Sequence, residues 1–364
     1  MPDAALGRAR LVAQGLITRP YQRPADAVAD FGAMQGQDLP GVIASAALRT
    51  QSGDPAEVLA DLTAGRLVRG YPMRGTVFLM APDDVVWVSQ LCNAAVLRAA
   101  VRRRADLGLD EQMVERARQE ALTVLPQHPE GLSRTELFER WTALGVPTDQ
   151  GRGYHVLAHL IGRTDLVHGP WNGIDQNIVT VAQWVGAGQD LETVFNGDRV
   201  AAVAELLRRY LTSHGPATLQ DFCWWTKLPQ REVKAAWSVI SDDVESGEGS
   251  DGLVRHWRVG LMGEVAALVK DLRRPLLLPG FDEFILGYAD RLFAMTADQH
   301  QQLVPGNNGV FGRSVVIDGT VRGLWKRGGR PGARSLELKA FGPLAKTHEV
   351  ALHRRFRDFP YHAD

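Results

Sequence analysis

Residues 131–141 read GLSRTELFERW and set the pattern from which the fold can be inferred. Ser133 can cap a helix whose apolar side chains, ending with Trp141, face a core. A loop rich in turn formers then leads to a second helix at about 154–162 and to a strand at 165–168. Helix, turn, helix and strand in this order are typical of a helix-turn-helix unit.

The same order recurs on both sides of this stretch. On the C-terminal side, the expected helices lie at 216–222 and 231–240, and the polar segment 245–252 reads as the tip of a wing. On the N-terminal side, the expected helices and strands lie at 24–31, 39–48, 55–64, 67–71 and 75–80. Three helices and a hairpin are the plan of a winged helix, so the sequence predicts tandem winged-helix units.

Helical periodicity fades after Pro275, where strands and Gly-rich turns take over. The expected strands lie at 275–279, 314–319, 321–325 and 335–341. Asp318 and Gly319 supply the positive φ angles of a two-residue hairpin turn. We therefore expect this part of the chain to form a small β-barrel or sandwich.

The predicted fold class is α+β, with tandem winged helices followed by a C-terminal β-barrel. We expect four domains, which are a first winged helix at 1–105, a second at 106–185, a third at 186–272, and the barrel at 273–364.

Composition sets the outer limits on function. The 364 residues carry 41 Lys and Arg against 42 Asp and Glu, a net charge of -1, so any binding of a polyanion must come from local clusters. No apolar run approaches the ~20 residues of a membrane span, and the N-terminus lacks a secretory h-region. Together with two cysteines, Cys92 and Cys223, these features predict a cytoplasmic protein without membrane contact.

Basic side chains gather in three places. Each cluster alone fits a solvated surface, but three clusters beside helix-turn-helix units favour nucleic acid. The clusters comprise Lys326, Arg327, Arg330 and Arg334 between two strands; Arg98, Arg102, Arg103 and Arg104 on a helix; and His353, Arg354, Arg355 and Arg357.

No metal or nucleotide cofactor is expected. His155 and His159 are spaced i, i+4 on a helix, but neither a following Glu nor nearby Cys or His ligands complete a zinc motif, so a structural role is favoured. Neither a P-loop nor a strand-linked GxGxxG is present.

Two polar stretches lie where side chains can face a cleft. Residues 35–38 read QGQD between two expected helices, and on composition alone they fit a linker with Asp38 as the cap of the next helix. Residues 281–284 read FDEF after an apolar strand and alone fit a capped corner.

Taken in order, these stretches resemble the winged-helix DNA glycosylases of the AlkZ-like family. The resemblance rests on QGQ at 35–37, YPMRGTVFL at 71–79, GPAT at 215–218 with FCWW at 222–225, LLPGFDEF at 277–284 with Arg291, and VIDG at 316–319 before GLW at 323–325. The fold that it implies is three tandem winged helices around a C-terminal β-barrel, in agreement with the patterns above.

The resemblance also implies an activity. The family's Gln-x-Gln signature falls on Gln35 and Gln37, with Gly36 between them. With these two residues, the enzyme is expected to hydrolyse the N-glycosidic bond of alkylated purines in double-stranded DNA. The enzyme is expected to be a monomer. The family probes DNA with a hairpin, for which the basic tip at 326–334 and the turn at 306–309 are both candidates. Expected DNA contacts are Arg74, Arg102, Arg103, Lys326, Arg327, Arg330 and Arg334.

Glutamines are adequate for this chemistry. A purine alkylated at N7 or N3 is a cationic leaving group, so the enzyme needs only to orient a water and stabilise an oxocarbenium ion. Asp38 and Asp282 are candidate electrostatic or positioning residues. No lysine adjoins the motif to form a Schiff base, so we expect a monofunctional glycosylase.

Other functions stay open at this stage. A non-catalytic winged-helix regulator would share the DNA-binding features, and a sugar-processing hydrolase could use Asp282 and Glu283. The sequence does not decide whether a damaged base is flipped out of the duplex or recognised within it.

Overall fold

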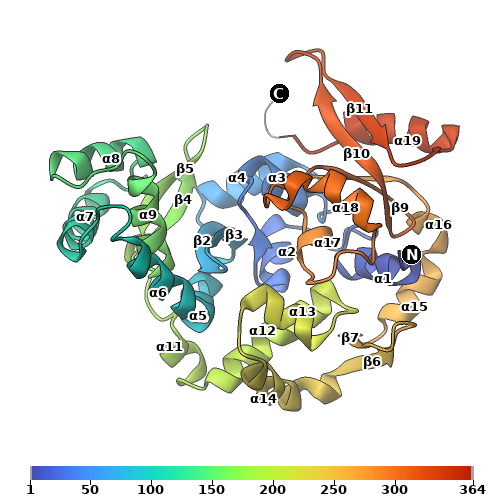
Figure 1. Ribbon diagram of the computed structural model, residues 1–364, viewed down its shortest axis with the longest axis horizontal. Coiled ribbons are helices and arrows are strands. Elements are labelled where there is room, and N and C mark those ends of the chain that lie inside the picture. Colours follow the sequence, from blue (N-terminus) through green and yellow to red (C-terminus); the bar gives the residue numbers. More distant parts are fainter. Residues whose placement is uncertain (1, 362–364) are drawn as a thin grey trace. The chain divides into compact units, whose positions relative to one another are not determined.

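The computed structural model describes residues 2–361, apart from the side chain of Asn307. The chain forms two compact units. The first contains Met1–Val58, Ala204–Trp225 and Pro229–Asp364, and the second contains Leu59–Val203 and Thr226–Leu228. Both units mix helices and strands, which confirms the expected α+β class (Figure 1).

The second unit is built on antiparallel strands in the order β3, β2, β4, β5. Its elements are β2 (Val68–Met73), β3 (Thr76–Met80), α5 (Pro82–Cys92), α6 (Ala94–Arg103), α7 (Glu111–Val124), α8 (Arg134–Ala143), α9 (Arg152–Gly162), β4 (Leu166–Trp171), β5 (Gln176–Thr180), α10 (Val181–Trp184) and α11 (Leu191–Phe195). A 3-10 helix at Leu125–Gln127 follows α7.

Helix α8 begins as its sequence predicts. The Ser133 side chain accepts from the Glu136 amide, and the Glu136 carboxylate accepts from the Ser133 amide, so a complete capping box starts the helix. Leu137 and Trp141 are fully buried in a core shared by α7, α8, α9, β4 and β5. A backbone bridge between Leu132 and Ile178 ties the segment before α8 to β5.

In the hairpin of β2 and β3, the turn lies at Arg74 and Gly75, both with positive φ. Pro72 is inside β2 rather than in the turn, and the register of the two strands shifts between Gly70 and Met73. Proline has no amide hydrogen to donate to a ladder, which accounts for the irregularity at this point.

The first unit combines N-terminal helices with the C-terminal part of the chain. Its N-terminal elements are α1 (Ala4–Ala13), α2 (Pro24–Phe31), β1 (Met34–Gln35), α3 (Leu39–Ala47) and the start of α4 (Pro55–Thr63). After α12 (Arg199–His214), which begins in the second unit, come α13 (Leu219–Thr226), α14 (Gln230–Ile240), β6 (Val244–Glu248), β7 (Val254–Arg258), α15 (Leu261–Ala267) and α16 (Val269–Leu272). A 3-10 helix at Ser241–Asp243 precedes β6.

Helices α12 to α14 and the hairpin of β6 and β7 repeat the element order of α7 to β5. A bridge between Ala217 and His256 joins the segment before α13 to β7, as the bridge between Leu132 and Ile178 does in the second unit. The segment expected to be a wing tip therefore lies in a hairpin, with β6 beginning at Val244.

The C-terminal strands form an open sheet. Its elements are β8 (Leu276–Leu278), α17 (Glu283–Leu286), α18 (Ala297–Leu303), β9 (Ser314–Ile317), β10 (Thr320–Gly328), β11 (Ser335–Ala340) and α19 (Lys346–Arg357), with a 3-10 helix at Pro305–Asn307. The antiparallel order is β11, β10, β9, β8. Within residues 2–361 its outer strands do not pair with each other, so the expected closed barrel is wrong.

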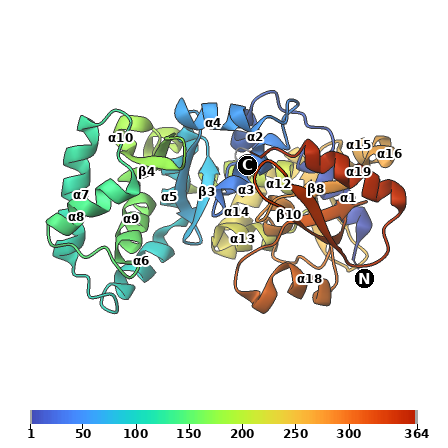
Figure 2. The ribbon, with the colours of Figure 1, turned by 90° about the horizontal axis from the view of Figure 1, so that it is seen from above.

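Helix α19 explains why this sheet stays open. Its buried side chains Leu352 and Phe356 belong to one apolar cluster with Trp325 of β10 and with Leu277 and Val315 of the neighbouring strands. The ribbon shows α19 beside this sheet (Figures 1 and 2). At the edge opposite β11, strand β8 is only three residues long, so it offers few backbone groups to which another strand could pair and close a barrel. A helix therefore buries the surface that barrel closure would otherwise bury.

The turn between β9 and β10 confirms the hairpin predicted at Asp318 and Gly319, where φ is 55° and 80°. Helix α1 packs directly on this turn. The Arg8 guanidinium donates to both Asp318 oxygens at 2.7 and 2.5 Å. A Cβ at Gly7 would lie 1.9 Å from the Gly319 carbonyl oxygen, so only glycine permits this approach.

We therefore expect Gly7→Ala to destabilise the protein by about 1–3 kcal/mol through overpacking. Gly263→Ala is the matched control, because this glycine is also helical but no atom lies within 4 Å of a Cβ built there. The control is expected to stabilise the helix by about 0.5–1 kcal/mol. Urea denaturation would measure both, and equal effects of the two substitutions would contradict the packing argument.

No single helix within residues 2–361 is long and apolar enough to cross a membrane. The bent pair of α5 and α6 meets the length and composition test only when both helices are counted together across a 70° bend.

Candidate active site

The Gln-x-Gln stretch leaves β1 and leads into α3. Gln35 is the last residue of β1 and only 7% exposed, whereas Gln37 is exposed. The Gln37 amide N–H donates to Oε1 of Gln35 at 3.2 Å, which closes a tight loop around Gly36. Because the partner is a donor, this bond fixes which end of the Gln35 amide is oxygen.

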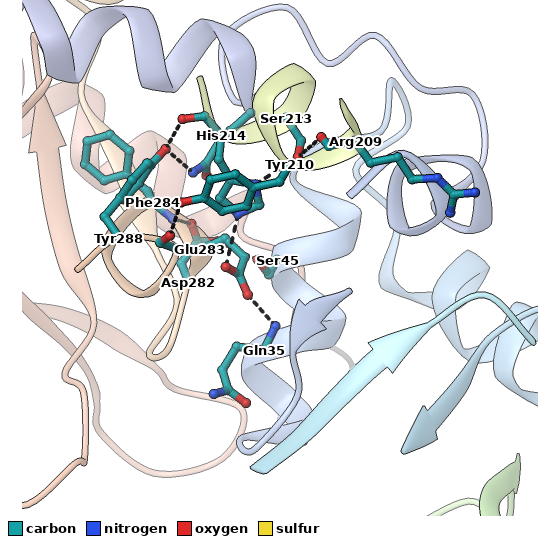
Figure 3. A network of polar contacts seen from close by, with 12 residues as sticks. Gln35, Ser45, Arg209, Tyr210, Ser213, His214, Asp282, Glu283, Phe284 and Tyr288 are labelled. Carbon is teal, nitrogen blue, oxygen red and sulfur yellow. Dashed lines mark hydrogen bonds and ion pairs between the residues drawn. The ribbon is translucent and has the colours of Figure 1, made fainter. Parts of the chain in front are cut away.

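The backbone of Gln35 is held from the opposite side. Its N–H donates to Oε1 of Glu283 at 2.6 Å, and Glu283 is 1% exposed at the start of α17. Figure 3 shows the Gln35 side chain pointing away from Glu283, so the backbone and the side chain face different environments.

Behind Glu283 lies the fully buried imidazole of His214. Its Nε2 is 3.2 Å from Oε2 of Glu283, and its Nδ1 is 2.8 Å from the Ser213 hydroxyl (Figure 3). Burial lowers the pKa of His214, whereas Glu283 opposes this shift. The imidazole is enclosed by aromatic rings, with Tyr210 stacked on it at 4.6 Å and Phe31 edge-on at 5.2 Å between ring centroids.

The hydrogen-bond partners determine where the protons lie in this network. Ser213 has a single hydroxyl hydrogen, which it donates to the Arg209 carbonyl oxygen at 2.8 Å. Its oxygen can therefore only accept from His214, so Nδ1 carries a hydrogen. The other ring nitrogen, Nε2, is the one that faces Oε2 of Glu283.

Asp282, next in the chain, is fully engaged elsewhere. Its carboxylate accepts from the Ser45 hydroxyl at 2.5 Å, from Arg49 at 3.0 and 3.1 Å, and from the Phe284 amide at 2.9 Å. The last bond caps α17. Burial raises the pKa of Asp282, but the Arg49 charge and these hydrogen bonds outweigh it and lower the pKa overall.

Arg49 extends this buried ion pair to α1. Its guanidinium is completely buried and also donates to the Gln14 side-chain oxygen at 2.8 Å. The Gln14 amide in turn donates to the Tyr288 hydroxyl at 3.1 Å. Asp282 thus joins three helices, α1, α3 and α17, immediately behind the Gln-x-Gln loop.

Asp38 occupies the position before α3, as predicted, but its side chain makes no capping hydrogen bond to the helix. Its carboxylate lies instead over Gly41, where a Cβ would come within 2.6 Å of Oδ2 and 2.8 Å of the Gly280 carbonyl oxygen. Glycine at position 41 therefore lets α3 approach the loop that carries Asp282 and Glu283.

A second feature of this unit surrounds Arg291. Its guanidinium carbon lies 5.0 Å from the ring centroids of both Trp224 and Phe311. Burial lowers the Arg291 pKa, and the residue lines a cavity of about 790 Å³ with Asp290 and His300.

The comparisons with known proteins can now be set against this geometry. The family model described as "DNA glycosylase AlkZ-like" matches residues 28–359. The chain belongs to the AlkZ-like DNA glycosylase family. It is therefore an enzyme of a class that cleaves glycosidic bonds, as the Gln-x-Gln resemblance predicted.

Two similar proteins from Streptomyces sahachiroi extend the match over most of the chain. A protein named "Interstrand DNA cross-link repair glycosylase" is 26% identical over 330 residues, covering 87% of this chain and 85% of its own length. The solved structure of "Streptomyces sahachiroi DNA glycosylase AlkZ" superposes with a TM-score of 0.74 at 20% identity, covering 99% of this chain and 96% of that one.

In this AlkZ-like chain, the basic cluster at 326–334 does not lie wholly between two strands as expected, because Lys326 and Arg327 are inside β10, paired with Glu337 and Leu336 of β11. Its four cationic side chains divide into two pairs. Lys326 and Arg330 are exposed. By contrast, the Arg327 guanidinium lies 3.9 Å from the centroid of the Tyr361 ring, and Arg334 donates to the Gly329 carbonyl oxygen at 2.5 Å. The outer pair can meet a ligand, while the inner pair also shapes the hairpin.

The basic cluster expected on α6 is smaller than its sequence suggests. Arg98, Arg102 and Arg103 are exposed, but Arg104 is buried and bonds to Glu111 and His159. Because Nε2 of His159 forms a hydrogen bond with the Arg104 guanidinium, this histidine has the structural partner that its predicted role requires. Within residues 2–361 no group of three or more His, Cys, Asp or Glu side chains is arranged to hold a metal ion.

Arg74, the remaining expected DNA contact, sits at the turn of β2 and β3 with φ of 58°. Its guanidinium carbon lies 5.0 Å from the Phe78 ring centroid. It belongs to the second unit, as do Arg102 and Arg103, whereas the Gln-x-Gln loop and the basic tip belong to the first.

Sequence reasoning overlooked the pair of Glu283 and His214. The sequence marked Glu283 as an acid between aromatic residues and as a candidate carboxylate of a sugar-processing hydrolase, but not as a partner of His214, which immediately precedes the GPAT stretch. The two residues are 69 positions apart and approach only in the folded chain. The one available signal is that each adjoins a stretch carrying the family resemblance.

Proposed function

We propose that this protein is a monofunctional DNA glycosylase that hydrolyses the N-glycosidic bond of purines alkylated at N7 or N3 in duplex DNA and leaves an abasic site. The single observation that carries the proposal is the fixed Gln-x-Gln loop, in which Glu283 holds Gln35 from behind while Gln37 remains exposed. The relative named for interstrand cross-link repair supports bulky adducts and crosslinks as further substrates.

The two glutamines have different roles in this proposal. Oε1 of Gln35 accepts from the Gln37 amide N–H, and an amide oxygen is the acceptor that a water would meet there. Gln37 presents a second amide to the same water at the loop surface. Two carbonyl dipoles orient the water and stabilise positive charge developing at C1′ of the deoxyribose.

The two aspartates support this site in different ways. Asp38 places a half-buried carboxylate beside the loop, where negative charge favours the oxocarbenium ion. Asp282 acts by holding the site in place, because its buried carboxylate accepts hydrogen bonds from Ser45, Arg49 and the Phe284 amide.

The repeated element order supports three tandem winged helices. Their helices are α2 to α4, α7 to α9 and α12 to α14, and their wings are the hairpins of β2 and β3, β4 and β5, and β6 and β7. We also propose that the enzyme acts as a cytoplasmic monomer, since a lesion enzyme has no half-sites to match.

Lys326, on β10, and Arg330, in the turn that follows β10, are proposed to contact DNA phosphates from this hairpin. Each alanine substitution should reduce the slope of log K against log salt by about 0.9 and weaken binding to all sequences alike. Arg116→Ala, at an exposed position on α7, is the control and should leave the slope unchanged. Fluorescence anisotropy over a salt series would measure this, and unchanged slopes in both hairpin variants would remove the hairpin from the DNA interface.

The substrate assignment is tested by an excision panel. Duplexes carrying one N7-methylguanine, one N3-methyladenine, one bulky N7 adduct or one interstrand crosslink are incubated with the enzyme and then treated with alkali. Strand scission at the lesion supports the proposal. Cleavage of undamaged duplex at an equal rate would contradict selectivity for cationic purines.

A further inference from the structure

We propose that Glu283 is a positioning residue of the glycosylase site, which fixes the backbone of Gln35 through one oxygen and is itself held by a hydrogen bond to His214 through the other. The inference rests on the function proposed above. It adds a dyad from α12 and α17 to the Gln-x-Gln loop, and neither residue of the dyad need touch the substrate.

The contact with Gln35 is short and buried. At 2.6 Å from Glu283 Oε1, the Gln35 amide has little room to shift without losing a hydrogen bond in a buried environment. The same residue's Oε1 closes the loop onto Gln37. Any displacement of the Gln35 backbone therefore moves both glutamines that are proposed to orient the water.

His214 is in turn unable to retreat from Glu283. A Cβ at Gly287 would lie 2.4 Å from Cδ2 and 2.9 Å from Nε2 of the imidazole, so the α17 backbone presses against the ring. Tyr210 stacks on the ring, and Ser213 holds Nδ1. Because the ring of His214 is held on several sides, it fixes the position of Glu283, and Glu283 in turn fixes the Gln-x-Gln loop.

The two hydrogen bonds of Glu283 allow a sharp choice of variants. In Glu283→Gln, the new amide oxygen can accept from the Gln35 N–H, and the new amide nitrogen can donate to Nε2 of a His214 that keeps its hydrogen on Nδ1. Both hydrogen bonds are thus retained, and the side chain can no longer ionise. Glu283→Ala removes both bonds, and His214→Phe removes the support while leaving Glu283 in place.

The primary experiment is single-turnover release of N7-methylguanine together with the dissociation constant for the same duplex. We expect Glu283→Gln to release base within about threefold of wild type. Glu283→Ala should be slower by about 10–100-fold with unchanged DNA affinity, because misplacement of about 1 Å can cost two orders of magnitude in rate. His214→Phe should fall between them.

Ser89→Ala is the matched control for burial. It deletes a buried hydroxyl that donates to the Val85 carbonyl oxygen within α5, and it touches neither the dyad nor the Gln-x-Gln loop. Its rate should equal that of wild type. If Glu283→Ala does not fold, the Glu283→Gln and His214→Phe rates still decide the question.

A second measurement does not require catalysis. Amide hydrogen exchange in the peptide containing Gln35 should accelerate about tenfold or more in His214→Phe and Glu283→Ala, and not in Glu283→Gln. The proposal is overturned if exchange and rate in these variants match wild type, or if Glu283→Gln is as slow as Glu283→Ala, which would assign the effect to charge. A wild-type enzyme that releases no base would refute the function while the exchange result still tests the positioning.

Discussion

Replacing Gln37 by alanine is expected to slow base release by about 10²–10³-fold while leaving DNA affinity within about twofold of wild type. The magnitude is that of losing one preorganised dipole at a site where charge develops. The substitution keeps the loop-closing hydrogen bond, because the backbone N–H of residue 37, which donates to Gln35, is retained in alanine. Gln37 is also exposed, so no buried side chain is lost. Single-turnover excision of N7-methylguanine, with affinity measured separately, gives both quantities.

Two further variants test this prediction, one that should also lose activity and one control that should not. Gln35→Ala should lose at least as much activity as Gln37→Ala, since it removes the amide oxygen that closes the loop and that we propose orients the water. Gln119→Ala, another exposed glutamine with a side-chain hydrogen bond to Glu115, should retain the wild-type rate. Equal rates for wild type and Gln37→Ala would rule out a water-orienting role for Gln37.

The largest expected effect on stability is at Asp282. Asp282→Ala leaves the completely buried Arg49 guanidinium without its carboxylate partner, and breaking a buried pair in this way costs about 3–5 kcal/mol. Denaturant unfolding would measure the loss. The double variant Arg49→Met with Asp282→Leu should lose much less than the single variant, since it removes both charges together.

The same pair gives a pH dependence with a defined sign. The Asp282 pKa is lowered in the folded chain, so the unfolded state binds the proton more readily. The pair's contribution to stability is therefore present above the ordinary aspartate pKa of about 3.9 and is lost as pH falls through the folded value. In Asp282→Asn, the free energy of unfolding should fall less steeply as the pH is lowered through this range. An unchanged pH dependence in the variant would contradict the assignment to Asp282.

Local features of the fold were predictable from sequence, and non-local ones were not. The capping box at Ser133 and the Asp-Gly turn at 318–319 depend on a few adjacent residues, and both were confirmed. Barrel closure depends on whether β8 meets β11, which short-range patterns do not encode, and α19 covers the sheet instead. Arg104 likewise read as part of a surface cluster, because its partner His159 lies on another helix.

The candidate site shows the same division. The sequence located the Gln-x-Gln stretch because its members are adjacent, and the resemblance assigned its chemistry. It could not find what holds that stretch, because His214 and Glu283 belong to helices far apart in the chain. The support of an active-site loop is a tertiary property, whereas its motif is a local one.

The most direct test of the central claim is the release of free base from a duplex containing a single N7-methylguanine. Wild-type enzyme in excess over DNA should liberate the modified base and leave one alkali-labile abasic site per duplex, while Gln37→Ala should bind the same DNA and release base about 10²–10³-fold more slowly. Sequence-selective binding to undamaged DNA with no base released by the wild-type protein would contradict this account and favour a winged-helix regulator.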